Sequence, residues 1–205
     1  MYNILALTLQ HLWLSAAGVL IACLVGMPLA VVLLRYRVLA GPVMAVIDAF
    51  QTIPSLAMLA ILMYYLGLGN TTLIVALFIY ALLPVVRNTY VGLDGVNREL
   101  LEAGKGMGMT RWQILRLVRI PIALPVILAG FRVAIVTSIG IATVGTLIGA
   151  GGLGDPIWRG IQLSDTALIL WGAVPAAVMA VLSDILLGRL EKTVIPRGMR
   201  VKIAD

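Results

Sequence analysis

The chain has 205 residues, of which 61% are hydrophobic and only 12% are charged, and its formal net charge is +6. A water-soluble domain of this size needs far more charge to cover its surface, so the composition excludes an ordinary soluble protein. It indicates one polytopic membrane domain over residues 1–205. A single cysteine and a single histidine exclude an intrachain disulfide and a His-rich metal site. We expect no bound metal and no nucleic-acid partner.

Five hydrophobic runs are long enough to cross a bilayer, which takes about 20 apolar residues as a helix. They cover about residues 12–34, 43–66, 71–86, 123–149 and 166–187. None alternates with the period of two that barrel strands show, and a backbone in lipid must satisfy its own hydrogen bonds. We therefore predict an all-α fold with about five transmembrane helices.

The basic residues predict the orientation of these helices. Lys and Arg follow the first run, fill the connection 87–121 and recur in the tail after residue 187, whereas 67–70 has no charge and 151–165 has Arg159 as its one basic residue. With five spans, all the basic segments lie on one side. That side is cytoplasmic by the positive-inside rule, so we expect the N-terminus outside and the C-terminus inside.

The second run contains a proline break with polar neighbours. Pro54 interrupts the helix, and Gln51, Thr52 and Ser55 flank it. Such breaks are tolerated in membranes where neighbouring helices or water satisfy the backbone. These four residues are candidates for lining a translocation pathway. Ordinary hydrogen bonds between helices are an equally good explanation.

Three runs each contain one ionisable residue: Asp48 in the second, Arg132 in the fourth and Asp184 in the fifth. Ionisable residues inside spans are functional candidates by default. Both aspartates are candidate partners of Arg132, because the predicted topology places all three toward the cytoplasmic half. The sequence leaves open whether the pairing is structural or takes part in gating.

The connection 87–121 predicts two helices joined by a turn. Residues 95–105 suit a short helix, and the glycines in 106–109 weaken its continuation. Thr110 then begins a second helix, because Thr110 and Gln113 fit a capping box. We therefore expect a helix–turn–helix at the cytoplasmic face.

This connection resembles the signature loop of ABC importer permeases. That loop reads Glu-Ala-Ala, three residues, Gly, nine residues, Ile, one residue, Leu and Pro. Here Glu102-Ala103-Gly104, Gly108, Val118, Ile120 and Pro121 occupy the matching positions, with Gly104 in place of the second alanine. The resemblance implies a coupling helix that inserts into a groove of a cytoplasmic ATPase. The residues implied in that contact are small, acidic or flexible: Glu102, Ala103, Gly104, Met107, Gly108 and Met109.

The same resemblance implies a non-catalytic transport subunit in the cell membrane of a prokaryote. Its expected partners are a dimer of ABC ATPases, a second permease chain that is identical or paralogous, and an extracellular or periplasmic solute-binding protein. The chain has no Gly-x-x-x-x-Gly-Lys-Ser/Thr sequence, so ATP and Mg are expected on the partner ATPase and no cofactor on this chain. The glycines of 149–154 precede Asp155-Pro156 and predict an external loop.

The segments 51–55, 149–161 and 190–198 extend the resemblance to the osmoprotectant branch, which imports glycine betaine, carnitine or choline. A methionine-type amino-acid permease is the alternative, since it has a similar size and a similar Gly-Leu-Gly-Asp segment. An ATP-independent channel or secondary transporter is a further alternative. An inverted repeat would favour that class, and the five predicted spans show no inverted repeat. An intramembrane enzyme needs paired carboxylates, a Ser/His pair or a metal cluster within a span, which this sequence does not supply.

Overall fold

The computed structural model describes residues 3–194, and within that range the chain is helical and contains no strand. The elements follow one another in chain order as α1 (Ile4–Arg35), α2 (Arg37–Thr52), α3 (Ser55–Leu66), α4 (Asn70–Asp94), α5 (Arg98–Gly106), α6 (Arg111–Ile114), the π-helical turn η1 (Leu115–Arg119), α7 (Ile120–Ala142), the 3₁₀ segment η2 (Thr143–Ile148), α8 (Gly154–Leu163) and α9 (Thr166–Val194). The tail from residue 195, whose sequence contributed to the predicted orientation and branch, lies outside the described residues.

Four helical segments in the described chain are long and apolar enough to span a membrane: α1, α4, the continuous run Arg111–Ile148, and α9. A fifth is a broken span in which α2 and α3 meet at 97°. The predicted all-α fold with about five spans is therefore confirmed. The second run is not one straight helix, because Ile53 and Pro54 adopt extended backbone between α2 and α3 and proline cannot donate a helical hydrogen bond.

The helices are longer than the hydrophobic runs that predicted them. The third run stops at residue 86, before Arg87, yet α4 continues to Asp94. Arg87 remains helical and its Nη2 donates to Asp48 Oδ2 of α2 at 2.5 Å. The connection predicted from residue 87 therefore begins eight residues later, at Gly95.

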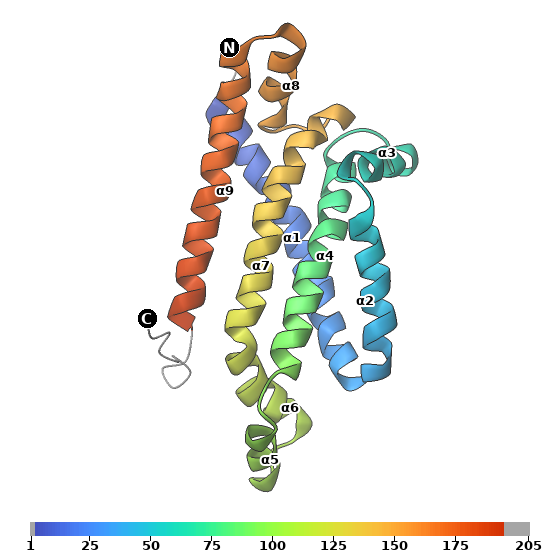
Figure 1. Ribbon diagram of the computed structural model, residues 1–205, viewed down its shortest axis with the longest axis vertical. Coiled ribbons are helices and arrows are strands. Elements are labelled where there is room, and N and C mark those ends of the chain that lie inside the picture. Colours follow the sequence, from blue (N-terminus) through green and yellow to red (C-terminus); the bar gives the residue numbers. More distant parts are fainter. Residues whose placement is uncertain (1–2, 195–205) are drawn as a thin grey trace.

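Helix α4 is the centre of the bundle. Figure 1 shows it between α2 and α7, with α1 crossing behind. Glycines allow this close packing: a Cβ at Gly18 of α1 would lie 2.6 Å from Leu77 Cβ, and one at Gly130 of α7 would lie 2.6 Å from the Pro84 carbonyl oxygen. Small residues at helix contacts are what membrane bundles use to bring backbones together.

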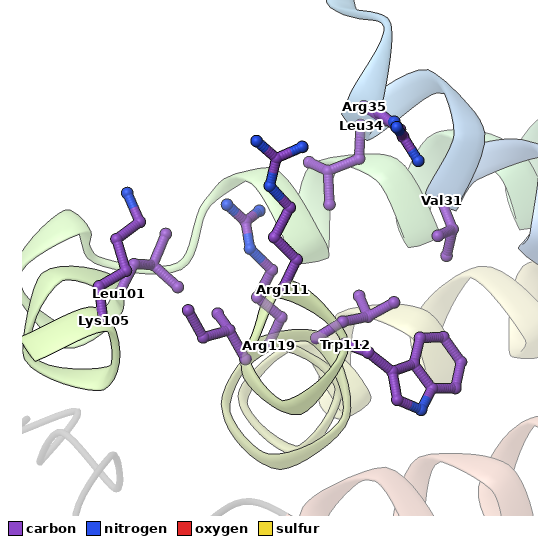
Figure 2. A pocket seen from close by; sticks show the side chains of 10 residues that line it. Val31, Leu34, Arg35, Leu101, Lys105, Arg111, Trp112 and Arg119 are labelled. Atoms are coloured by element: carbon purple, nitrogen blue, oxygen red, sulfur yellow. The ribbon is translucent and has the colours of Figure 1, made fainter. Parts of the chain in front are cut away.

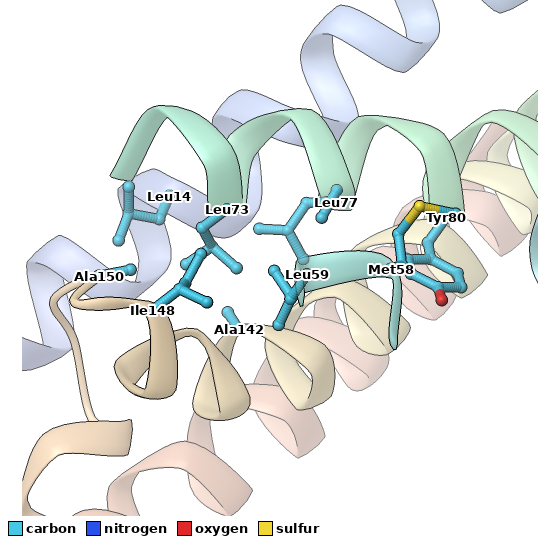
Figure 3. Close-up of a cluster of buried hydrophobic side chains, with 10 residues drawn as sticks. Leu14, Met58, Leu59, Leu73, Leu77, Tyr80, Ala142, Ile148 and Ala150 are labelled. Atoms are coloured by element: carbon cyan, nitrogen blue, oxygen red, sulfur yellow. The ribbon is translucent and has the colours of Figure 1, made fainter. Parts of the chain in front are cut away.

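The connections gather at two opposite ends of the bundle. Helices α3 and α8 lie at one end, and α5 and α6 extend beyond the other (Figure 1). A core of buried residues from α1, α3, α4 and η2 joins the first end, as Figure 3 shows for Leu14, Leu59, Leu73 and Ile148. The orientation of the two ends relative to the bilayer stays a prediction.

The segment predicted as an external loop is partly helical. Residues 149–153 do form a loop, with Gly149 and Gly152 at positive φ, but Gly154–Leu163 is helix α8. Asp155 and Pro156 lie in its first turn, where an acidic residue and a proline both favour helix initiation. The loop predicted for 149–154 is therefore present as far as residue 153, and helix α8, which begins at Gly154, was not predicted.

His11 ties three separate segments together. Its side chain is fully buried on α1. Its Nδ1 accepts a hydrogen bond from the Leu153 N–H at 3.2 Å, and its Nε2 lies 3.0 Å from the Ile139 carbonyl oxygen. Because Nδ1 accepts, Nε2 carries the proton and donates to Ile139. A single neutral imidazole thus links α1, α7 and the loop before α8.

Candidate functional site

The helix–turn–helix lies at the α5–α6 end of the bundle. Asn97 begins α5, since its side-chain oxygen accepts a hydrogen bond from the Glu99 N–H at 3.0 Å. The predicted helix therefore starts at Arg98 rather than at residue 95. Leu101 and Gly104 form the buried face of α5, and Leu101 packs with Val96 and Ile114. The opposite face of α5 is exposed.

The C-terminus of α5 ends in a Schellman motif. Gly108 has φ +79°, its N–H donates to the Lys105 carbonyl at 2.9 Å, and the Met109 N–H donates to the Gly104 carbonyl at 3.0 Å. This is the pattern of a left-handed residue directly after a helix, where glycine avoids the steric cost of a Cβ. The predicted break at 106–109 is present, and Gly108 is the residue that makes the chain turn.

The next helix begins at once. Thr110 Oγ1 accepts from the Gln113 N–H at 3.3 Å, and Gln113 Oε1 accepts from the Thr110 N–H at 2.7 Å. This is the predicted capping box, in which each residue satisfies a backbone donor of the other. Consecutive residues therefore close one helix and open the next, with Met107 to Met109 between the two helices.

The six residues implied in the ATPase contact divide into two groups. Glu102, Ala103, Met107 and Gly108 are exposed, and the Met107 side chain is 71% exposed. Gly104 is buried, and the partly buried Met109 packs against the small core of Val96, Leu101 and Ile114. The first group offers a surface, and the second supports the turn from within.

The polar residues around Pro54 are hydrogen-bonded in the structure. The Gln51 amide donates to the Tyr80 carbonyl oxygen at 2.5 Å, and the Tyr80 hydroxyl donates to the Ile53 carbonyl oxygen at 2.5 Å. Thr52 Oγ1 donates to the Ala49 carbonyl at 2.7 Å. Pro54 and Thr52 remain exposed and Ser55 is partly exposed. Tyr80 satisfies the backbone at the break and was not among the predicted residues, although a tyrosine within an apolar run is itself a signal.

The predicted intramembrane pairing is half correct. Arg132 of α7 binds Asp184 of α9 through two hydrogen bonds of 2.6 and 2.7 Å, and its Nη1 lies 3.6 Å from a Glu191 carboxylate oxygen. Gly188 lets the guanidinium lie against α9, because a Cβ there would be 3.2 Å from Arg132 Cζ. Asp48 does not join this cluster, since it pairs with Arg87.

Residues 3–194 contain no candidate metal-binding site. No group of three or more His, Cys, Asp or Glu side chains there is arranged to hold a metal ion. The described residues instead form a helical bundle with an exposed turn, a broken span and four ion pairs between helices.

Comparison with known proteins identifies the family. Residues 5–198 match the model of the binding-protein-dependent transport system inner membrane component. The chain belongs to this family. It is a membrane-spanning permease of the ABC importer type, as the signature loop predicted.

Named relatives share about half of the residues over most of the chain. The carnitine transport permease protein OpuCD of Listeria monocytogenes is 52% identical over 91% of this chain and 84% of the relative. The glycine betaine/carnitine/choline transport system permease protein OpuCD of Bacillus subtilis is also 52% identical, over 91% of this chain and 82% of the relative. The choline transport system permease protein OpuBD of B. subtilis is 51% identical over 91% and 83%.

Solved structures confirm the fold. An inward-facing structure of the MetNI methionine ABC transporter aligns with a TM-score of 0.85 and 22% identity, covering 95% of this chain and 99% of that chain. An amino-acid ABC transporter crystallised with histidines aligns with a TM-score of 0.76 and 20% identity, over 93% of each chain. At these identities the likeness concerns the fold alone.

Proposed function

We propose that this permease carries a small quaternary ammonium osmoprotectant, such as glycine betaine, carnitine or choline, across a prokaryotic cell membrane. The observation that carries the proposal is the identity of 51–52% over 91% of the chain with permeases whose names specify these solutes. The methionine alternative has weaker support, because the likeness to the methionine transporter is at 22% identity.

The turn between α5 and α6 is the proposed contact with a cytoplasmic ABC ATPase. Glu102, Ala103, Met107 and Gly108 are exposed, and they lie at the α5–α6 end of the bundle. A small-residue turn allows close approach, and a flexible methionine adapts to a surface that changes shape. Gly104 and Met109 support the turn. ATP and Mg belong to the ATPase, and this subunit is non-catalytic.

The pathway itself is proposed to pass the α2–α3 break. Gln51, Thr52, Pro54 and Ser55 surround it, and Tyr80 holds the broken backbone through Ile53. One chain with about five spans supplies half of a pore, so a second permease chain, identical or paralogous, completes it. An external solute-binding protein delivers the solute, and the N-terminal end of α1 faces that protein.

Uptake by the assembled transporter tests the solute. The tagged chain is purified from its native membrane with its ATPase and binding protein, and the recovered subunits are expressed in a strain that lacks osmoprotectant uptake. Labelled glycine betaine, carnitine or choline should accumulate in an ATP-dependent way, while labelled methionine should not. Accumulation of methionine alone would refute the osmoprotectant assignment but leave the permease architecture intact.

A further inference from the structure

A basic pocket lies where α1 ends, between that helix and the α5–α6 unit. It has a volume of about 470 Å³. Figure 2 shows Val31, Leu34 and Arg35 on one side, with Arg111, Trp112 and Arg119 facing them and Lys105 farther along the same hollow. Leu101, Ile114 and Leu115 complete the lining. The pocket is therefore built from α1, α5, α6 and η1.

The lining combines concentrated positive charge with apolar walls. Arg35, Lys105, Arg111 and Arg119 are cationic, and none of the lining residues is acidic. Five of the remaining residues are aliphatic and one is tryptophan. Four cations that share one hollow repel each other, so an anion between them would relieve that repulsion.

The described chain leaves this charge without a matching carboxylate. Arg37, Arg87 and Arg132 each form a salt bridge with an aspartate. Among residues 3–194, Arg119 instead donates to the Leu93 carbonyl at 2.6 Å, and Arg35 lies over the Tyr36 ring. Asp94 also attracts Arg119 electrostatically, but its carboxylate already binds Arg37. No salt bridge involves any of the four lining cations within that range.

We propose that this pocket binds the phosphate headgroup of an anionic phospholipid. Arginine guanidinium groups are well shaped to bind phosphate oxygens in pairs. The pocket lies at the end of the apolar α1, where the predicted orientation places the cytoplasmic headgroup layer. Basic pockets beside membrane helices suit anionic headgroups. Val31, Leu34 and Leu115 can contact the first part of an acyl chain, and the 65% exposed Trp112 suits the same interface.

The apolar walls favour a lipid over a free anion or an acidic protein side chain, neither of which brings hydrocarbon to cover them. The inference rests on the proposed placement of the α5–α6 unit at the cytoplasmic face of the membrane. Its consequence is a second connection between α1 and the α5–α6 unit: a bound phosphate would join Arg35 of α1 to Arg111 of α6.

Native mass spectrometry in detergent tests the proposal on the full-length chain with the partners it retains. The probes are dioleoylphosphatidylglycerol, dioleoylphosphatidylcholine and inorganic phosphate. The double variant R35Q/R111Q removes two pocket cations, and K105Q removes one from an exposed position. Arg116→Gln is the matched control, because Arg116 is an exposed arginine of η1 that does not line the pocket.

We expect phosphatidylglycerol to bind the unmodified chain and the R116Q control equally well. It should bind R35Q/R111Q at least about tenfold more weakly, and K105Q several-fold more weakly, than the unmodified chain. Phosphatidylcholine should bind weakly to all of them. Equal phosphatidylglycerol binding by all variants overturns the proposal, as does inorganic phosphate that competes with the lipid at equal concentration.

The ATPase retained by each variant is measured in the same preparations. Loss of the ATPase with unchanged lipid binding overturns the proposal, since it would assign the pocket to an acidic segment of that subunit. Mass spectrometry counts the lipids bound to the permease itself, whereas uptake reports the solute and ATPase recovery reports the ATPase contact. Failure of the lipid proposal is therefore distinguishable from failure of the proposed function.

Discussion

Gly106 and Gly108 both face open space, but only Gly108 adopts the left-handed backbone conformation. A Cβ added to either residue would meet nothing within 4 Å, whereas φ is +79° at Gly108 alone. The two glycines therefore separate the effect of backbone conformation from that of side-chain bulk, at positions two residues apart in one turn.

We expect Gly108→Ala to impair uptake while Gly106→Ala leaves it nearly unchanged. A Cβ in the left-handed region costs about 1–2 kcal/mol, so G108A should distort the Schellman turn. Gly106 is the last residue of a helix, where alanine is favourable. Solute uptake and ATPase recovery at equal membrane expression are the measurements. Equal loss in both variants would show that bulk rather than backbone conformation matters.

Gly104→Ala should be tolerated. The added Cβ would lie 3.4 Å from Met109 Sδ and 3.5 Å from Ile114 Cγ1, which is ordinary van der Waals contact. Alanine is also the better helix former by about 1 kcal/mol. The thermal midpoint of the purified protein should stay equal or rise by a few degrees, with uptake retained. Gly104→Leu is the contrasting variant, because its larger side chain has no room and should lower the midpoint.

Replacing His11 by leucine should destabilise the bundle by about 2–6 kcal/mol. The change leaves the Leu153 N–H and the Ile139 carbonyl without their partner, and each unsatisfied buried group costs about 1–3 kcal/mol. Ser15→Ala is the matched control, because Ser15 is also buried on α1 and its hydroxyl has no hydrogen-bond partner among the described residues. Thermal unfolding in detergent should show a clear loss for H11L and little change for S15A.

Arg132→Gln should weaken the contact between α7 and α9. It removes a two-pronged ion pair with Asp184, so we expect a lower thermal midpoint of unfolding. The exchange variant R132D/D184R restores opposite charges. If it recovers the thermal midpoint but not uptake, the pair takes part in gating. Recovery of both would assign it a structural role.

Local patterns predicted the turn well, because the interactions that form it lie within a few residues. Thr110 and Gln113 form their capping box three residues apart, and Gly108 turns the chain by its own backbone freedom. The same local signals were available but unused at Asn97 and at Asp155-Pro156, which begin α5 and α8. Their use would have corrected the start of α5 and would have indicated that a helix begins at residue 154.

Partners that are distant in sequence were not predictable in the same way. Asp48 pairs with Arg87 rather than Arg132 because α2 packs on α4, a contact that the hydrophobic runs do not specify. The role of His11 depends on Ile139 and Leu153, more than 100 residues away. Asp184 was predictable as a partner of Arg132 because depth in the membrane narrows the choices.

The helix that follows the turn, beginning at Arg111, has a mechanical consequence. From Arg111 to Ala142 the chain is helical without interruption, through α6, η1 and α7. Arg132 lies on this continuous helix and forms an ion pair with Asp184 of α9. A helix without a break in its backbone can carry a tilt along its length. Sideways travel at Arg111 would therefore reach Arg132 and its contact with α9 through continuous helix.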